Sequence, residues 1–133
     1  DFLFALRDRN TIGMVAESGD ELVGLFVYQL KRNHISLMNM AVAPAWRRKG
    51  IGSRMVAKLV EKLSAHRRRT LVVRTRDTNL VAQLFFRKLG FKAYKVCREW
   101  FPEGDDAYLF RWDIKEVLEN AGQVCGKDGK ETV

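Results

Sequence analysis

Residues 44–54, PAWRRKGIGSR, join an apolar, strand-like run, ISLMNMAVA, to a helical pattern that begins at Ile51. The stretch contains three consecutive cations, followed by two glycines that flank one isoleucine. The first N–H groups of a helix have no partners within it, and the helix dipole adds about half a positive charge there. Glycine lets an anion approach the backbone closely. The stretch therefore predicts a phosphate-binding loop, with an ordinary tight turn as the alternative.

The common nucleotide-binding motifs do not fit this loop. A P-loop requires G-x-x-x-x-G-K-[ST], and the sequence contains no such string. The dinucleotide fingerprint G-x-G-x-x-G would begin at Gly50 and Gly52, but Met55 stands where its third glycine belongs. The loop thus points to a phosphate ligand outside these two motifs.

Length and composition indicate an ordinary globular chain. Its 133 residues fit one domain, with 47% hydrophobic and 30% charged residues. Cys97 and Cys125 form no close pair and suggest neither a zinc site nor a disulfide, so no metal and a reduced, cytoplasmic setting are expected. The net charge of +8 favours an anionic partner: a nucleotide cofactor, a nucleic acid or an acidic surface. No apolar run is long enough to cross a membrane.

Hydrophobic periodicity predicts the order of the elements. Residues 1–10 have apolar positions typical of the end of a helix that lacks a beginning, which would fit a truncated N-terminal part. Alternation predicts a hairpin over 11–30 and a third strand over 34–43. A helix is expected from Ile51 to Ala65, and the cations 67–69 just past it are interpreted as its solvated end.

A second set of elements follows in the C-terminal half. A short buried strand, LVVRT, precedes a helix that Asn79 caps and Gly90 ends, with a core face of Leu80, Leu84, Phe85 and Leu89. Two more strands are expected at 91–101 and 107–113. The fold class predicted is α+β, a mixed and mostly antiparallel central sheet flanked by helices. Residues 1–118 are expected to form a single domain, and 119–133 a polar, mobile tail.

Two blocks of the sequence resemble one family. RRKGIG at 47–52 is similar to the R/Q-x-x-G-x-G/A signature of the GNAT superfamily of acetyl-CoA-dependent N-acetyltransferases. LVVRTRDTNLVAQLFFRKLGFK at 71–92 resembles the second conserved block of that family: strand, asparagine, helix and a terminal L-G-F. The resemblance covers roughly residues 11–112, and it is closest to the RimI-like branch, which acetylates protein N-terminal amines.

The resemblance implies a co-substrate and a set of contacts. Acetyl-CoA would donate its acetyl group directly to an amine, with its pantetheine arm along the strand at 40–42 and its diphosphate in the loop. Trp100 and Phe101 correspond to aromatic residues that shape the acceptor site, and Arg74 faces the amine entrance. The residues expected to bind the co-substrate are Met40, Ala41, Val42, Arg47, Arg48, Lys49, Gly50, Ile51, Gly52, Ser53, Asn79 and Phe86.

The usual acid and base positions of the family carry other residues here. Arg74 stands where the branch commonly has a glutamate, and Ser36 where some relatives place one. A guanidinium stays protonated and cannot accept the amine proton. Phe86 replaces a tyrosine that commonly faces the departing thiolate. The catalytic residues therefore stay unassigned; the weak candidates are Tyr94, Glu99 and Tyr108, expected on the last two strands, while His34 is expected at the surface.

Three functions compete on this sequence. An N-acetyltransferase acting on a protein N-terminus or a small amine leads, and a GNAT-like acyl-CoA-binding protein with weak or no catalysis is the alternative. A nucleic-acid-binding module is disfavoured because the cations gather at one loop and two helix ends. Arg74 at the amine entrance would favour an acceptor with a carboxylate or phosphate over a polyamine. A monomer or homodimer without membrane association is expected.

Overall fold

The computed structural model describes residues 2–114, which divide into two compact units between Leu71 and Val72. The predicted tail at 119–133 lies outside the described residues. Within residues 2–114, neither helix is long and apolar enough to span a membrane.

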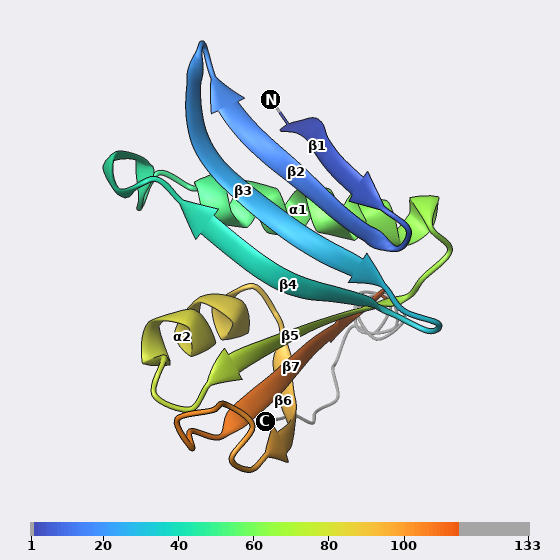
Figure 1. Ribbon diagram of the computed structural model, residues 1–133, viewed down its shortest axis with the longest axis vertical. Helices are drawn as coiled ribbons and strands as arrows, with labels where there is room; N and C mark the ends of the chain where they lie inside the picture. Colours follow the sequence, from blue (N-terminus) through green and yellow to red (C-terminus); the bar gives the residue numbers. More distant parts are fainter. Residues whose placement is uncertain (1, 115–133) are drawn as a thin grey trace, which may run out of the picture. The chain divides into compact units, whose positions relative to one another are not determined.

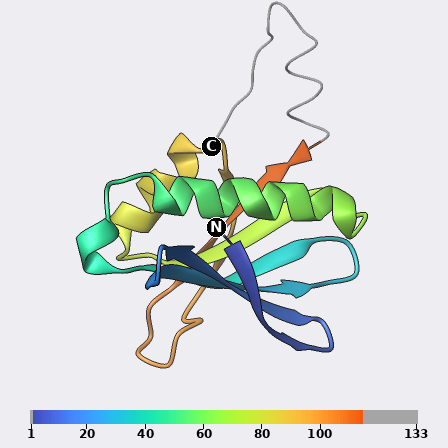
Figure 2. The same ribbon diagram turned by 90° about the horizontal axis from the view of Figure 1, so that it is seen from above.

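The first unit is a meander of antiparallel strands with one helix (Figure 1). Each strand pairs with the next in sequence. The strands are β1 (Phe2–Asp8), β2 (Thr11–Ser18), β3 (Glu21–Leu30) and β4 (Ile35–Val42), and the helix is α1 (Ile51–Ala65). Figure 2 shows α1 running along one face of these strands. The predicted hairpin, third strand and first helix are confirmed, and α1 buries Met55, Val56, Leu59 and Leu63.

The helical prediction for residues 1–10 is wrong. Residues 2–8 form β1, which pairs with β2 from Phe2 opposite Ala16 to Asp8 opposite Thr11. A tight turn joins the two strands, and Arg9 within it has a φ of +53°. Apolar residues in so short a segment fit a helix and a strand equally well, so pairing with β2 decides the outcome.

The second unit contains one helix, two whole strands and all of β5 (Thr70–Arg76) except its first two residues. The strands lie in the order β5, β7 (Ala107–Asp113) and β6 (Lys92–Cys97), and α2 (Leu80–Lys88) follows β5 in the chain. The side chain of Asn79 accepts a hydrogen bond from the Ala82 N–H at 3.1 Å, and Gly90 adopts a φ of +99°. The predicted cap and terminating glycine of this helix are therefore confirmed.

Two details of the second unit differ from expectation. Leu80 and Leu84, predicted for the core face of α2, are 61% and 54% exposed, whereas Phe86 is 4% exposed. Phe86 packs edge-on against Phe85 and Phe91, with ring centroids 5.0 and 5.2 Å away. This aromatic cluster fixes the rotation of α2. The strand predicted over 91–101 ends at Cys97, because the chain turns there.

Candidate functional site

The predicted co-substrate strand, β4, contains a bulge. Val27 pairs with Asn39 and Tyr28 with Leu37, so Met38 is an extra residue in β4. Side chains before the bulge are buried, whereas Met38 is 47% exposed and those that follow it are half-buried or exposed. A bulge bends the strand and increases its twist. The segment Met40–Val42 therefore leaves the core as it approaches the loop.

Gly24 in β3 controls how closely this segment packs. A Cβ on Gly24 would lie 3.0 Å from the carbonyl oxygen of Ala41, and 3.6 Å from Cγ2 of Ile51. The glycine thus lets β3 approach both β4 and the first turn of α1. Gly24 was not among the residues predicted for the site, although a glycine inside a strand pattern signals close backbone approach.

The loop between β4 and α1 is anchored through its aromatic residue and one arginine. A short 3₁₀ helix, Pro44–Trp46, follows β4, and the Trp46 indole N–H donates to Oε2 of Glu21 at 3.1 Å. The ammonium of Lys49 lies 5.6 Å from the centre of the Trp46 ring. Arg47 Nε donates to the Val42 carbonyl at 3.2 Å. These contacts hold the cations at the start of α1.

The first turn of α1 has the features of an anion site. Gly50 is the N-cap residue with a left-handed φ of +82°, no side chain caps the helix, and its first turn has no acidic residue. A Cβ on Gly50 would meet nothing within 4 Å, so the backbone conformation, and not crowding, requires glycine. Arg48, Lys49 and Ser53 are exposed around it. We call residues 47–53 the glycine loop.

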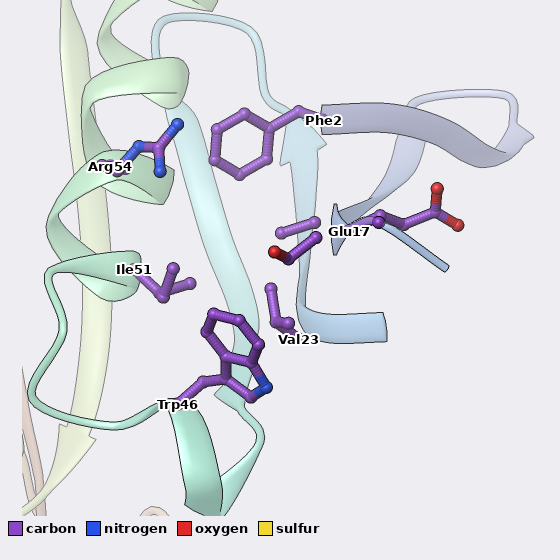
Figure 3. A pocket seen from close by; sticks show the side chains of 9 residues that line it. Phe2, Glu17, Val23, Trp46, Ile51 and Arg54 are labelled. Carbon is purple, nitrogen blue, oxygen red and sulfur yellow. The ribbon is translucent and has the colours of Figure 1, made fainter. Parts of the chain in front are cut away.

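A cavity of about 290 Å³ lies in the first unit beside α1. Figure 3 shows Phe2 and Arg54 on one side of it, and Trp46 and Ile51 on another. Of the predicted co-substrate residues, Ile51 alone is among those that line this cavity. The cavity is therefore not the cradle that the glycine loop predicts, and we assign it no ligand.

In the second unit, β5 presents two arginines on one face. Leu71, Val73 and Thr75 are buried, and side chains alternate along a strand, so Arg74 and Arg76 point to the opposite face. The guanidinium carbon of Arg74 lies 4.2 Å from the centre of the Trp100 ring.

Arg76 makes the same kind of contact: its guanidinium carbon lies 4.0 Å from the centre of the Phe101 ring. The two predicted acceptor aromatics are thus both stacked on arginines of β5.

The two arginines differ in their polar partners. Arg76 forms ion pairs with Glu103 at 3.0 Å and with Asp105 at 3.1 Å. Hydrogen bonding to Glu103 raises the pKa of Arg76. Arg74 Nε is buried and has no hydrogen-bond partner, and no carboxylate of residues 2–114 forms an ion pair with Arg74. Arg74 is therefore a cation without a counter-charge in the described part of the chain.

A second bulge, in β6, sets the position of Tyr94. Ala93 pairs with Phe110 and Lys95 with Leu109, which leaves Tyr94 as the extra residue of β6. The guanidinium carbon of Arg111 lies 5.3 Å from the centre of the Tyr94 ring. Burial raises the pKa of the Tyr94 phenol, while Arg111 and Arg74 oppose this shift.

A phenol with a raised pKa is protonated at neutral pH and donates a hydrogen bond. We call Arg74, Tyr94, Trp100 and Arg111 the arginine face.

The other acid and base candidates lie on a turn and on two strands. The prediction that Glu99 lies on a strand is wrong: it occupies a turn with a φ of +49°, and its N–H donates to Oδ1 of Asp106 at 2.8 Å. Tyr108 lies on β7 and is half-buried. The buried Ser36 donates to the sulfur of Met38 at 3.5 Å. No group of His, Cys, Asp and Glu residues within 2–114 could hold a metal ion.

The residues predicted for the site are divided between the two units. The co-substrate residues at 40–53 lie in the first unit, whereas Asn79, Phe86 and the predicted acceptor residues lie in the second. Phe86 is buried among aromatic rings, and Asn79 caps α2. His34, expected at the surface, is half-buried, and burial with the charge of Lys31 lowers its pKa.

The chain matches the model of a known family over much of its length: the acetyltransferase (GNAT) family, at residues 1–91. It is 28% identical over 123 residues to an N-alpha-acetyltransferase of Sulfurisphaera tokodaii, covering 81% of this chain and 72% of the relative. It is 26% identical over 86 residues to a [ribosomal protein bS18]-alanine N-acetyltransferase of Haemophilus ducreyi, covering 65% of this chain and 59% of that protein.

A solved structure also resembles the chain. The GNAT family acetyltransferase of Elizabethkingia anophelis, solved with acetyl-CoA bound, has a TM-score of 0.74 at 18% identity, over 78% of this chain and 76% of that one. At this identity the likeness concerns the fold. The predicted family and the predicted fold class, mixed and mostly antiparallel with flanking helices, are confirmed.

Proposed function

The chain belongs to the acetyltransferase (GNAT) family, and on this premise we propose that it transfers the acetyl group of acetyl-CoA to a protein N-terminal amine. Acetyl transfer from acetyl-CoA to an amine is the reaction of this family, so the predicted class of enzyme and its co-substrate agree with the membership. The single observation that carries the proposal is the glycine loop at the uncapped start of α1.

The glycine loop fits a diphosphate. The N–H groups in the first turn of α1 lack a side-chain cap, and the left-handed Gly50 leaves open space above the backbone. Arg48 and Lys49 would neutralise the phosphate charges, while Arg47 holds the loop to β4 through the Val42 carbonyl. When bound, acetyl-CoA supplies the acetyl thioester. We assign its pantetheine arm to the backbone of Met40–Val42.

The acceptor amine would react without a dedicated carboxylate base. Arg74 occupies the usual base position, and its guanidinium cannot accept a proton. An N-terminal amine has a pKa of about 7.7–8.0, so part of it is already neutral at physiological pH. Positive charges nearby disfavour a second cation, so Arg74 and Arg111 would lower the pKa of an amine bound beside them. The arginines would thus raise the neutral, reactive fraction of the acceptor.

The protein N-terminus is favoured as acceptor because both curated relatives carry names of that class. One is named as an N-alpha-acetyltransferase and the other as an alanine N-acetyltransferase of ribosomal protein bS18. A small amine is the other acceptor considered. We further propose a single acetyltransferase domain over residues 1–118 that acts in the cytoplasm as a monomer or homodimer, without nucleic acid.

The proposal is tested by thiol release from acetyl-CoA across a panel of peptides, amino acids, polyamines and aminoglycosides. We expect turnover with peptides that have a free N-terminus, and none with the same peptides after N-terminal blocking. The rate should rise with pH as the neutral amine fraction grows, without an inflection at about pH 4–7, where a carboxylate or histidine base would titrate. Turnover of small amines alone would contradict the proposed acceptor.

One observation favours the second candidate, an acyl-CoA-binding protein with weak or no catalysis. Arg74 and the buried Phe86 replace both groups that the family commonly uses for proton transfer. This candidate predicts calorimetric binding of CoA without thiol release on any member of the panel. Thiol release that depends on a free amine would exclude it.

A further inference from the structure

We propose that the arginine face binds a carboxylate of the acceptor, so that preferred acceptors have an acidic group close to the amine. This inference rests on the proposed function, because it concerns the acceptor of that reaction. The shared chemistry is an amine with a carboxylate nearby. In a peptide the carboxylate would belong to an acidic second residue, and in a free amino acid it would be the α-carboxylate.

Arg74 has no ion-pair partner within residues 2–114. Its Nε atom is buried and has no hydrogen-bond partner. A buried N–H group without a partner is costly, so such groups in proteins are usually hydrogen-bonded. On the same face of the same strand, Arg76 satisfies this rule with Glu103 and Asp105. The difference indicates that the partner of Arg74 comes from a ligand.

The Trp100 ring orients the guanidinium of Arg74. The guanidinium carbon of Arg74 lies 4.2 Å from the centre of the Trp100 ring. Stacking on an aromatic ring uses the face of the guanidinium and leaves its edge for hydrogen bonds. A carboxylate can accept two parallel N–H bonds from that edge. The single ammonium of a lysine could not present two such parallel donors.

The surroundings of Arg74 add to the selectivity for an anion. Arg111 lies beside Tyr94, and both arginines act on the phenol. The protonated Tyr94 hydroxyl would supply a further donor. Val72, two residues before Arg74 on β5, belongs to a buried cluster with Ala107 and Leu109, and Cys97 and Phe101 pack against this cluster. A low local dielectric strengthens charge interactions, so a carboxylate is favoured and a second cation on the acceptor is disfavoured.

The test compares kcat/KM for peptides that begin with alanine and differ in the second residue: glutamate, glutamine or lysine. Free glutamate tests whether an α-carboxylate can take the place of an acidic second residue. A peptide with phosphoserine at the second position tests whether a phosphate can do so. We expect the wild type to prefer glutamate over glutamine by about tenfold or more, since hydrogen bonds to charged groups contribute about 1.5–3 kcal/mol. The preference should shrink as salt is added.

Two variants test whether Arg74 causes the preference for the glutamate peptide. Arg74→Gln should abolish the preference: the ratio of kcat/KM for the glutamate peptide to that for the glutamine peptide should fall to about one, whatever the change in the absolute rates, since glutamine keeps hydrogen-bonding capacity without charge. Arg76→Gln is the matched control, because Arg76 stacks on the neighbouring ring but its charge is already paired. It should lower turnover of both peptides equally, if at all. Far-UV circular dichroism and CoA binding show that both variants are folded.

Calorimetry of the same peptides separates this inference from the proposed function. If no peptide is acetylated but the glutamate peptide binds the wild type more tightly than Arg74→Gln, the inference stands and the proposed activity fails. If peptides are acetylated with equal kcat/KM for glutamate, glutamine and lysine, the inference is overturned and the activity stands. A preference that Arg74→Gln retains would also overturn it. Equally strong selection of phosphoserine would widen the ligand to anions in general and overturn the carboxylate assignment.

Discussion

The glycine loop of the first unit and the arginine face of the second are both cationic, but they are built differently. The loop presents exposed cations around backbone N–H groups, and its backbone turns through two residues with positive φ, Arg48 at +63° and Gly50 at +82°. The arginine face presents side chains that aromatic rings hold in place. The loop therefore suits any ligand with a diphosphate, whereas the face can discriminate among acceptors by their charge.

Replacing Gly50 with alanine should have the largest effect, because it affects the loop at its backbone. A left-handed conformation costs an ordinary residue roughly 1–2 kcal/mol, and relaxing it would turn the N–H groups of α1 away from the phosphates. We expect Gly50→Ala to weaken CoA binding by about tenfold or more, measured by calorimetry. Gly104→Ala, at a φ of +97° in the second unit with open space around it, is the matched control. Equal loss of CoA affinity in both variants would contradict a specific role of Gly50.

Gly24→Ala should have the second largest effect, because Gly24 packs against β4, the strand that leads into the glycine loop. The new Cβ would lie 3.0 Å from the Ala41 carbonyl oxygen, a backbone atom that cannot swing away. We expect a loss of about 1–2 kcal/mol in the free energy of unfolding, the range typical of overpacking, measured by urea denaturation. CoA affinity should fall with it, since Ala41 belongs to the proposed pantetheine strand. Unchanged stability would show that β3 and β4 are not tightly packed there.

Trp100→Leu tests the arginine face and should have a smaller effect than the two glycine substitutions. Loss of the ring removes a cation–π contact that contributes about 0.5–1 kcal/mol at exposed sites. The preference for acidic over neutral acceptors should therefore fall about twofold to fivefold, measured as a ratio of kcat/KM values. Phe101→Leu is its control, because Phe101 stacks on the ion-paired Arg76. A loss of charge preference in the Phe101 variant alone would reverse the assigned roles.

The smallest effect expected is on stability near neutral pH. Burial and the charges of Lys62, Arg7 and Arg68 lower the pKa of His66. The unfolded chain therefore binds more protons than the folded one, so stability rises with pH up to the ordinary histidine pKa and falls as pH drops below about 6.5. We expect His66→Gln to flatten this slope in denaturation curves recorded from pH 7 to pH 5. An unchanged slope would show that another group causes the pH dependence of stability. His34, whose pKa is also lowered, would then be the next residue to replace.

The same contrast explains what the sequence revealed. The pattern around RRKGIG predicted the start of α1 at Ile51, since helix ends depend on local chemistry. Asn79 and Gly90 were predictable as cap and terminator for the same reason. The pairing of Arg76 with Glu103 and Asp105 was not, because those carboxylates lie 27 and 29 residues further along the chain.

Other misses share this tertiary origin. Residues 2–8 became a strand through pairing with β2, which their own pattern could not specify. The rotation of α2 depends on how Phe86 packs against Phe91, so the expected core positions Leu80 and Leu84 were wrong. Tyr94 stands beside Arg111 because of a bulge in β6 that leaves no mark in the alternation of the sequence. Packing and strand pairing, and not residue type alone, decided each case.

The most direct test of the central claim is calorimetric titration of the wild-type protein with CoA and with pantetheine, which lacks the diphosphate. If the glycine loop grips the diphosphate, CoA should bind at least about tenfold more tightly, a difference of about 1.4 kcal/mol. A thermal melt should agree, because a ligand at 100 times its dissociation constant adds about 2.7 kcal/mol of stability. Equal affinity for the two compounds would contradict the claim that the loop binds the diphosphate.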